Sequence, residues 1–158
     1  MSLKSILNWA APRLAQIGAT DTVLAYGANM ASLNNSNSGA IVIGAPVYSP
    51  SAGNFDKAEA NAGTTVEVIG LVADTSITNG TSGNVQTSGV VSATTGQWDT
   101  VAGTSGGLTA GTVYYLDPAT AGKLTSTAPS TVGQYIVRVG KALSTTQLEL
   151  AISQPILL

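Results

Sequence analysis

From Gly39 onward, short apolar runs alternate with short polar stretches along the chain. The runs are rich in Val, Ile, Thr and Tyr, and Gly, Pro, Asn or Asp interrupts them at short intervals, as in strands joined by tight turns. This pattern predicts an all-β fold, either a barrel or a sandwich of short strands. The predicted strands are residues 40–43, 46–48, 66–73, 83–91, 112–116, 134–143 and 147–152.

The first 38 residues have a different pattern. Apolar residues recur there at spacings of three and four, which would place them on one face of a helix, and Pro12 would end or kink that helix. The next stretch, LAYGANMASLNNSNSG, is rich in Asn, Ser and Gly and is typical of a linker. We therefore predict a partly helical or extended N-terminal arm and linker over residues 1–38 and a β-domain over 39–158. The members of the apolar stripe are Leu3, Ile6, Leu7, Ala10, Leu14 and Ile17.

Two stretches of the β-domain resemble each other, GAPVYSPSAGNF at 44–55 and GTVYYLDPATAGKL at 111–124. In both, a tyrosine lies four residues after a glycine, and a Pro-containing turn, Ala-Gly and a large apolar residue follow. A later predicted strand contains Gly70 in the first case and Gly140 in the second, where we expect a bulge or a close backbone approach. The sequence thus predicts two similar β units, at about 39–91 and 106–158, that together form one closed structure.

The charge of the chain changes the picture of its surface. Only 9% of the 158 residues are charged, whereas about 25% is typical, so that covering this surface strips water from few charges and self-association is favoured. The net charge is −2 and the basic residues are scattered, which argues against a nucleic-acid partner. No apolar run approaches the roughly 20 residues that span a bilayer, so no membrane partner is expected.

The residue types that usually carry chemistry are scarce. The chain contains no histidine and no cysteine, which removes the usual general base, the thiol nucleophile and the commonest ligands of soft metals. The near pair of carboxylates, Asp56 and Glu59, lies in FDKAEANAG, which is typical of a solvated loop. Asp117 precedes Pro118 and is interpreted as a turn former. We therefore predict no catalytic residue, no metal ligand and no cofactor site, and a protein that is not an enzyme.

Apolar residues in the arm and near the C-terminus are candidates for contacts with other chains. A solvated tail rarely carries three large apolar side chains in a row, as ISQPILL does. For Trp98, between two stretches interpreted as polar turns, three roles remain open: a core residue, an interface anchor, or a ring platform for a sugar. The candidate interface residues are Leu3, Ile6, Leu7, Trp9, Leu14, Trp98, Ile156, Leu157 and Leu158.

The second half of the chain resembles a β-domain of tailed-bacteriophage virion proteins. The resemblance rests on the run W…GGLT-x-G-x-x-YYL…GKLT…AP…G…VG-x-ALS…L, from Trp98 to Leu148, and extends less clearly over residues 40–158. Such domains occur in capsid decoration, or cement, proteins and in head fibres. The resemblance implies a homotrimer on the capsid surface of a virion, bound to the major capsid protein and made in the host cytoplasm.

Two functions are therefore expected, in different classes. The first is a non-enzymatic structural protein that decorates the capsid exterior and stabilises the shell through its β-domain and terminal contacts. The alternative is a recognition module of a tail fibre or head fibre that binds host-surface carbohydrate through Trp98 and the strand with Tyr114 and Tyr115, since aromatic faces and hydroxyl groups suit sugars.

Overall fold

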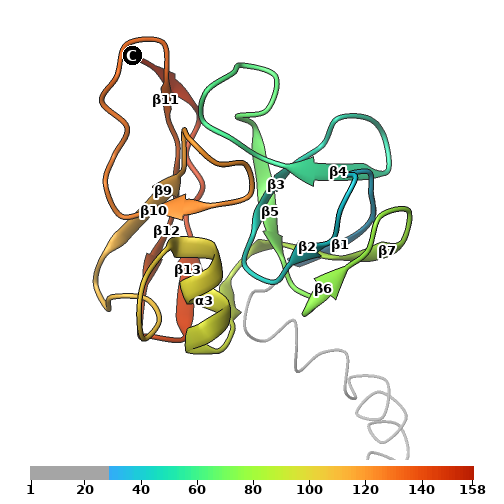
Figure 1. Cartoon of the computed structure of the whole chain (residues 1–158), viewed down its shortest axis with the longest axis horizontal. Helices are drawn as coiled ribbons and strands as arrows, with labels where there is room; N and C mark the ends of the chain where they lie inside the picture. The colour runs from blue at the N-terminus through green and yellow to red at the C-terminus, as the bar shows by residue number, and fades with distance from the viewer. Residues whose placement is uncertain (1–28) are drawn as a thin grey trace, which may run out of the picture.

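The structure is a computed structural model that describes residues 29–158. Within this range the chain forms many short strands and one helix, α3 (Figure 1), which confirms the predicted all-β class. The elements are β1 (Asn29–Asn35), β2 (Ile41–Val42), β3 (Pro46–Tyr48), β4 (Asn54–Lys57), β5 (Val68–Val72), β6 (Ser76–Ile77), β7 (Ser82–Ser88), β8 (Val90–Ser92), α3 (Thr95–Ala102), β9 (Val113–Leu116), β10 (Leu124–Thr125), β11 (Tyr135–Ile136), β12 (Arg138–Ala142), β13 (Gln147–Leu150) and β14 (Ile156–Leu157).

The first unit, β1 to β7, forms a closed barrel in the strand order β1-β4-β3-β5-β7. Strand β7 pairs antiparallel with β1, while β4 pairs with β1 in parallel and closes the barrel. Its interior is filled by a cluster of buried apolar side chains that includes Phe55, Val47 and Val85. The small pair β2 and β6 lies beside this barrel, on the right of Figure 1.

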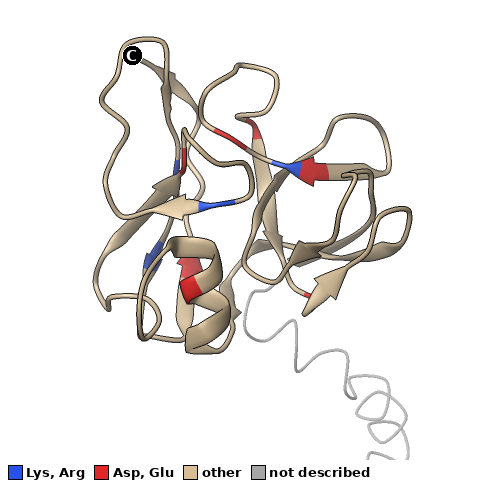
Figure 2. Cartoon of the chain, viewed as in Figure 1, with Lys and Arg blue, Asp and Glu red and all other residues tan. Residues whose placement is uncertain are grey.

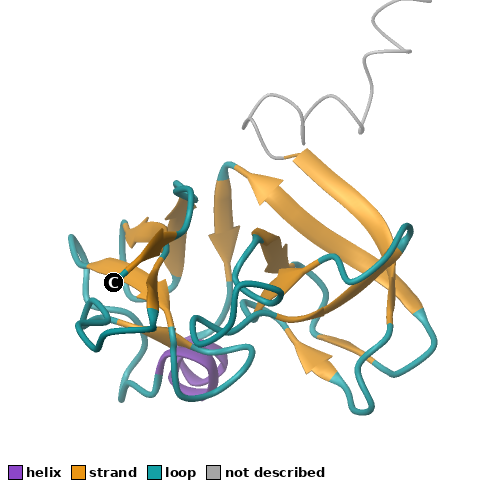
Figure 3. Ribbon diagram, turned by 90° about the horizontal axis from the view of Figure 1, so that it is seen from above, coloured by secondary structure: helices purple, strands orange, loops and turns teal. Residues whose placement is uncertain are grey.

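The second unit, β8 to β13, is an open sheet in the order β10-β9-β12-β13-β8. Helix α3 lies against β10, at one edge of this sheet. Strands β11 and β14 form a separate two-stranded ribbon. In Figure 3 the two units lie side by side, with the helix in the same half as the C-terminus.

The two units have the same strand order, as the internal repeat predicts. Strands β4-β3-β5-β7-β1 correspond to β10-β9-β12-β13-β8 in their pairing. The bulge is also repeated, because the pairing of β3 with β5 shifts register between Val68 and Gly70, and that of β9 with β12 shifts between Arg138 and Gly140. Gly70 lies opposite Val47, and Gly140 lies opposite Tyr114. The matching tyrosines and glycines in the sequence therefore mark equivalent positions of two similar β units.

The expectation that both units together form one closed structure is wrong, because the first unit closes by itself. By their pairing with β7 and β13, Ser32 of β1 corresponds to Ser92 of β8. Strand β1 continues to Asn35, and its residues Asn34 and Asn35 pair with β4. After Ser92, in contrast, the chain leaves the sheet and reaches Thr94, the N-cap of α3. The helix thus begins where a closing strand would be needed, and the second sheet stays open.

Strand β1 corrects the prediction for residues 29–35, which were expected in the arm and linker. These residues read as a linker because Asn and Ser rarely fill a core. In the barrel, however, buried Asn35 donates from its side chain to the carbonyl oxygens of Ile77 (2.7 Å) and Gly39 (3.1 Å). A buried amide is tolerated when its hydrogen bonds are made, and only the folded barrel supplies these partners.

Smaller corrections concern the boundaries of other strands. Residues 55–57, expected in a solvated loop, belong to β4, and residues 76–77, for which no strand was predicted, form β6. The single strand predicted at 83–91 is divided at Gly89, whose φ is 85°, into β7 and β8. The strand predicted at 134–143 is likewise divided, into β11 and β12.

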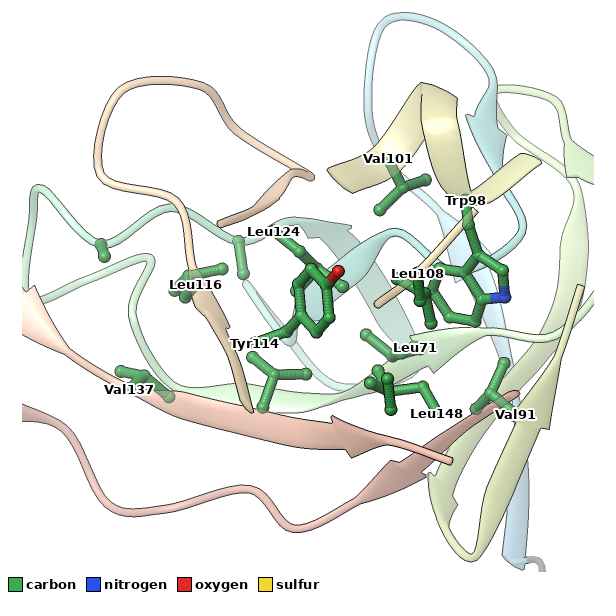
Figure 4. Packing of buried hydrophobic residues seen from close by; sticks show 14 of the residues in the cluster. Leu71, Val91, Trp98, Val101, Leu108, Tyr114, Leu116, Leu124, Val137 and Leu148 are labelled. Atoms are coloured by element: carbon green, nitrogen blue, oxygen red, sulfur yellow. The ribbon is translucent and has the colours of Figure 1, made fainter. Parts of the chain in front are cut away.

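One hydrophobic cluster joins the two units. Leu71 of β5 packs in the same cluster as Trp98 of α3 and Tyr114 and Leu148 of the second sheet (Figure 4). Backbone hydrogen bonds also cross between the units, from Gly122 N to the carbonyl oxygen of Ala58 (2.8 Å) among others. The two units are therefore packed against each other through a shared core.

Candidate interaction surface

Helix α3 places Trp98 inside the protein. Thr94 caps the helix in a capping box, because its hydroxyl accepts from Gln97 N (3.3 Å) and its own N–H donates to the Gln97 side chain (2.8 Å), an arrangement that satisfies free N–H groups of the first turn. Gly103 ends the helix in the left-handed conformation with a φ of 62°. The T-x-x-Q spacing is the sequence signal for this helix, which the strand pattern around it obscured.

Trp98 is completely buried, and its indole N–H donates to the carbonyl oxygen of Thr146 (3.0 Å). Its ring lies so close to Gly44 of the first unit that a Cβ at Gly44 would come within 2.8 Å of it. The interpretation of Trp98 as an interface anchor or sugar platform is therefore wrong. Trp98 is a core residue at the junction of the two units.

The motif GTVYYLDPATAGKL is likewise used for structure. Tyr114 is buried, and its hydroxyl accepts from Thr109 N (3.1 Å), while Tyr115 is half-buried. The carboxylate of Asp117 accepts from the backbone N–H groups of Ala119 (2.6 Å) and Thr120 (3.1 Å), as expected for a turn former. Lys123 donates from its ammonium group to the carbonyl oxygen of Thr100 and so ties β10 to α3.

Asp99 holds the glycine-rich loop that follows α3. Its carboxylate accepts from Gly107 N (2.7 Å), Gly106 N (3.0 Å) and the hydroxyl of Thr104 (2.9 Å). The hydrogen bond from Gly107 is the largest cause that lowers the pKa of Asp99 below its usual 3.8, and burial opposes it. The Asp99 carboxylate therefore stabilises the conformation of this loop.

We expect the stability of the protein to decrease on acidification in part through Asp99. Because the folded-state pKa is lower than that of the unfolded chain, the stabilisation is present above about pH 4 and is lost as the pH falls through the folded pKa. The melting temperature of Asp99→Asn should be lower than that of the wild type at pH 7. It should also fall by less than that of the wild type between pH 5 and pH 3. Thermal unfolding at several pH values measures this, and an unchanged pH dependence in the variant would contradict it.

The carboxylate of Asp56 makes hydrogen bonds within the protein. Asp56 accepts from the side chain of Asn37 (2.7 Å) and from Lys57 N (2.6 Å), and so connects β4 to the loop after β1. Within residues 29–158, no group of three or more acidic side chains is placed to hold a metal ion.

Two shallow clefts flank α3. One lies between the helix and β10 and is lined by residues such as Thr100, Thr120 and Lys123. The other lies between the helix and the β2–β6 pair, with Thr75, Gln97 and other small or polar residues. Neither lining includes an aromatic ring, so a sugar in these clefts would lack the stacking face on which the recognition hypothesis depends.

Exposed apolar side chains gather at the C-terminal ribbon, which is formed by β11 and β14. Tyr135 pairs with Leu157, and Ile136 pairs with Ile156. Ile156 and Leu157 are 59% and 60% exposed, Leu158 is 36% exposed, and Val132 in the preceding loop is 88% exposed. Among the predicted interface residues, these C-terminal ones thus lie on the surface and close together. Leu3, Ile6, Leu7, Trp9 and Leu14 lie outside the described residues.

The comparisons with known proteins leave the family open. No protein-family model matches the sequence, and no curated protein is similar enough to count as a relative. Among residues 29–158, no helix has the length and apolar character needed to cross a bilayer.

Proposed function

We propose that this protein is a non-enzymatic structural component of a bacteriophage virion that decorates the capsid exterior. It associates with further copies of itself, for which the sequence resemblance implies three, and binds the major capsid protein of an assembled shell. Its place of action is the capsid surface, after synthesis in the host cytoplasm.

The observation that supports this proposal most is the use of the motif residues in the core and turns. Trp98, Leu108, Tyr114, Leu116 and Leu124 are all buried in the cluster that joins the units. The residues that resemble the phage β-domain are therefore those that build a compact scaffold. A scaffold with few charges and an exposed apolar ribbon suits attachment to another protein surface.

The mechanism of such a protein is mass action. A ligand that binds the assembled shell but not the separated subunits stabilises the shell by RT ln(1 + [L]/Kd) per site, which is about 2.7 kcal/mol at a concentration of 100 Kd. Summed over many sites, this free energy resists rupture of a shell under internal pressure. The binding groups need contact area rather than chemical reactivity.

We expect removal of residues 1–20 to abolish binding to shells. These residues carry the apolar stripe, and the truncation retains every residue of the barrel and the second sheet. Co-sedimentation of the purified variant with empty phage heads that lack the protein measures binding, and circular dichroism establishes that the variant is folded. Leu7→Glu in the full chain should weaken binding at least tenfold. If the truncated protein binds heads as the full chain does, the arm has no role in attachment.

A further inference from the structure

The outer edge of the C-terminal ribbon is free within the described residues. Leu158 N donates to the carbonyl oxygen of Gln134 (3.0 Å), which makes this a hydrogen-bonded position of the antiparallel pair. Positions alternate in such a pair, so the N–H and C=O of Leu157 point away from β11. On the other side of the ribbon, Tyr135 N donates to the carbonyl oxygen of Ala60 (2.9 Å). The inner edge is thus attached to the first unit, and the outer edge is available for a further strand.

The two segments that form and flank this edge contain no charged side chain. The ribbon and its flanking segments, residues 126–136 and 151–158, include no Asp, Glu, Lys or Arg, and Figure 2 draws the chain around the C-terminus in tan. Charged residues are depleted in the buried centres of interfaces, and unpaired apolar edges favour pairing with another strand.

A second copy of the same chain fits this surface. In a contact with twofold symmetry the same patch faces itself, so any charge near the axis would meet a like charge. The side chains of β11 and β14 carry no charge and meet no such repulsion. Two antiparallel β14 strands would also place the free N–H and C=O of Leu157 opposite those of the other copy. Because β14 has only two residues, the exposed side chains of Val132, Ile156 and Leu157 must supply most of the contact.

We propose that two copies of this protein associate through their C-terminal ribbons, with β14 antiparallel to β14 and Leu157 at the twofold axis. The inference rests on the self-association in the proposed function and names its surface. It differs from the threefold arrangement that the resemblance implies, and the two arrangements differ in mass.

The mass of the full chain in solution is the first test. Sedimentation equilibrium should give twice the mass of the 15.8 kDa chain, and Leu157→Glu should raise the dimer dissociation constant at least 100-fold. Leu143→Glu is the matched control, because Leu143 is also half-exposed (49%). Leu143 follows the end of β12 that is farther from the ribbon in the chain, roughly 17 Å along the strand from Arg138. A monomer or a trimer for the wild type, or equal weakening by both variants, overturns the inference.

Cysteine cross-linking tests the register without disturbing the charge. The chain has no cysteine, so each variant carries a single thiol. Two Leu157→Cys residues at the axis would have Cα atoms about 5.5 Å apart, within the range for a disulfide, and should cross-link under mild oxidation. Ile156→Cys would face Leu158 of the other copy and should cross-link at least tenfold less. Absence of the Leu157→Cys disulfide, or equal yields from both variants, overturns the antiparallel register.

Binding to empty phage heads separates this inference from the proposed function. A wild-type dimer that does not co-sediment with heads supports the ribbon contact and contradicts the decoration function. A monomer that binds heads contradicts the ribbon contact and supports the decoration function.

Discussion

Replacement of Trp98 by alanine is expected to destabilise the fold by about 3–5 kcal/mol, the usual cost of removing a buried aromatic side chain. Trp98 has no exposed surface, contacts Gly44 across the junction of the units and donates a hydrogen bond to Thr146. The substitution removes all three contributions at once. Urea unfolding followed by far-UV circular dichroism measures the change.

Two comparisons make the Trp98 result specific. Leu143→Ala truncates a half-exposed apolar side chain and should change stability by less than about 0.5 kcal/mol, as is usual for surface positions. Trp98→Phe retains most of the volume but loses the indole hydrogen bond, and should lie between the wild type and the alanine variant. A Trp98→Ala protein as stable as the wild type would show that the ring is not part of the core.

Alanine at Gly70 or Gly140 is expected to destabilise the protein by roughly 3 kcal/mol, at the upper end of the cost of overpacking. A Cβ at Gly70 would lie 2.3 Å from the carbonyl oxygen of Gln86, and one at Gly140 would lie 2.3 Å from that of Glu149. Both obstacles are backbone atoms of the next strand, so relief requires the strands to separate. Because the two positions are equivalent in the repeat, the two variants should lose similar amounts of stability in urea unfolding.

Gly96→Ala is the matched control for these substitutions. Gly96 lies in α3, and apart from its chain neighbours and the helix backbone no atom is within 4 Å of the position that its Cβ would take. Alanine favours a helix over glycine by up to about 1 kcal/mol, so this variant should be slightly more stable than the wild type. If all three variants behaved alike, the close approach of strands at Gly70 and Gly140 would not explain the effect.

The strands of the described region could be predicted where apolar and β-branched residues alternate with turn formers. Residues 46–48 were predicted with the bounds that β3 has, and 112–116 differ from β9 by one residue. Strands rich in polar residues were missed, above all β1, because a single sequence does not show that Asn35 will find two carbonyl acceptors inside a barrel. Helix α3 was missed because eight residues with two buried positions, Trp98 and Val101, are too short to show a helical period.

The candidate surface could be predicted only in part. The apolar C-terminal residues stood out in the sequence, and Ile156 and Leu157 are exposed as an interface residue must be. Trp98 also stood out, and the structure buries it. Both are large apolar side chains next to polar stretches, so local sequence gives them the same appearance, and only the packing of other elements around them distinguishes the two cases.

The sequence by itself determined the β class and the internal repeat of the protein, because alternation and turn formers act within a few residues and the repeat is a comparison of residues. The tertiary structure decided which unit closes, and the reason is local to one place: the chain continues as a strand after Ser32 but begins a capped helix after Ser92. It also decided which apolar residues are covered. Burial depends on contacts between residues far apart in the chain, such as those of Trp98 with Gly44 and Thr146, and no local pattern of residues contains that information.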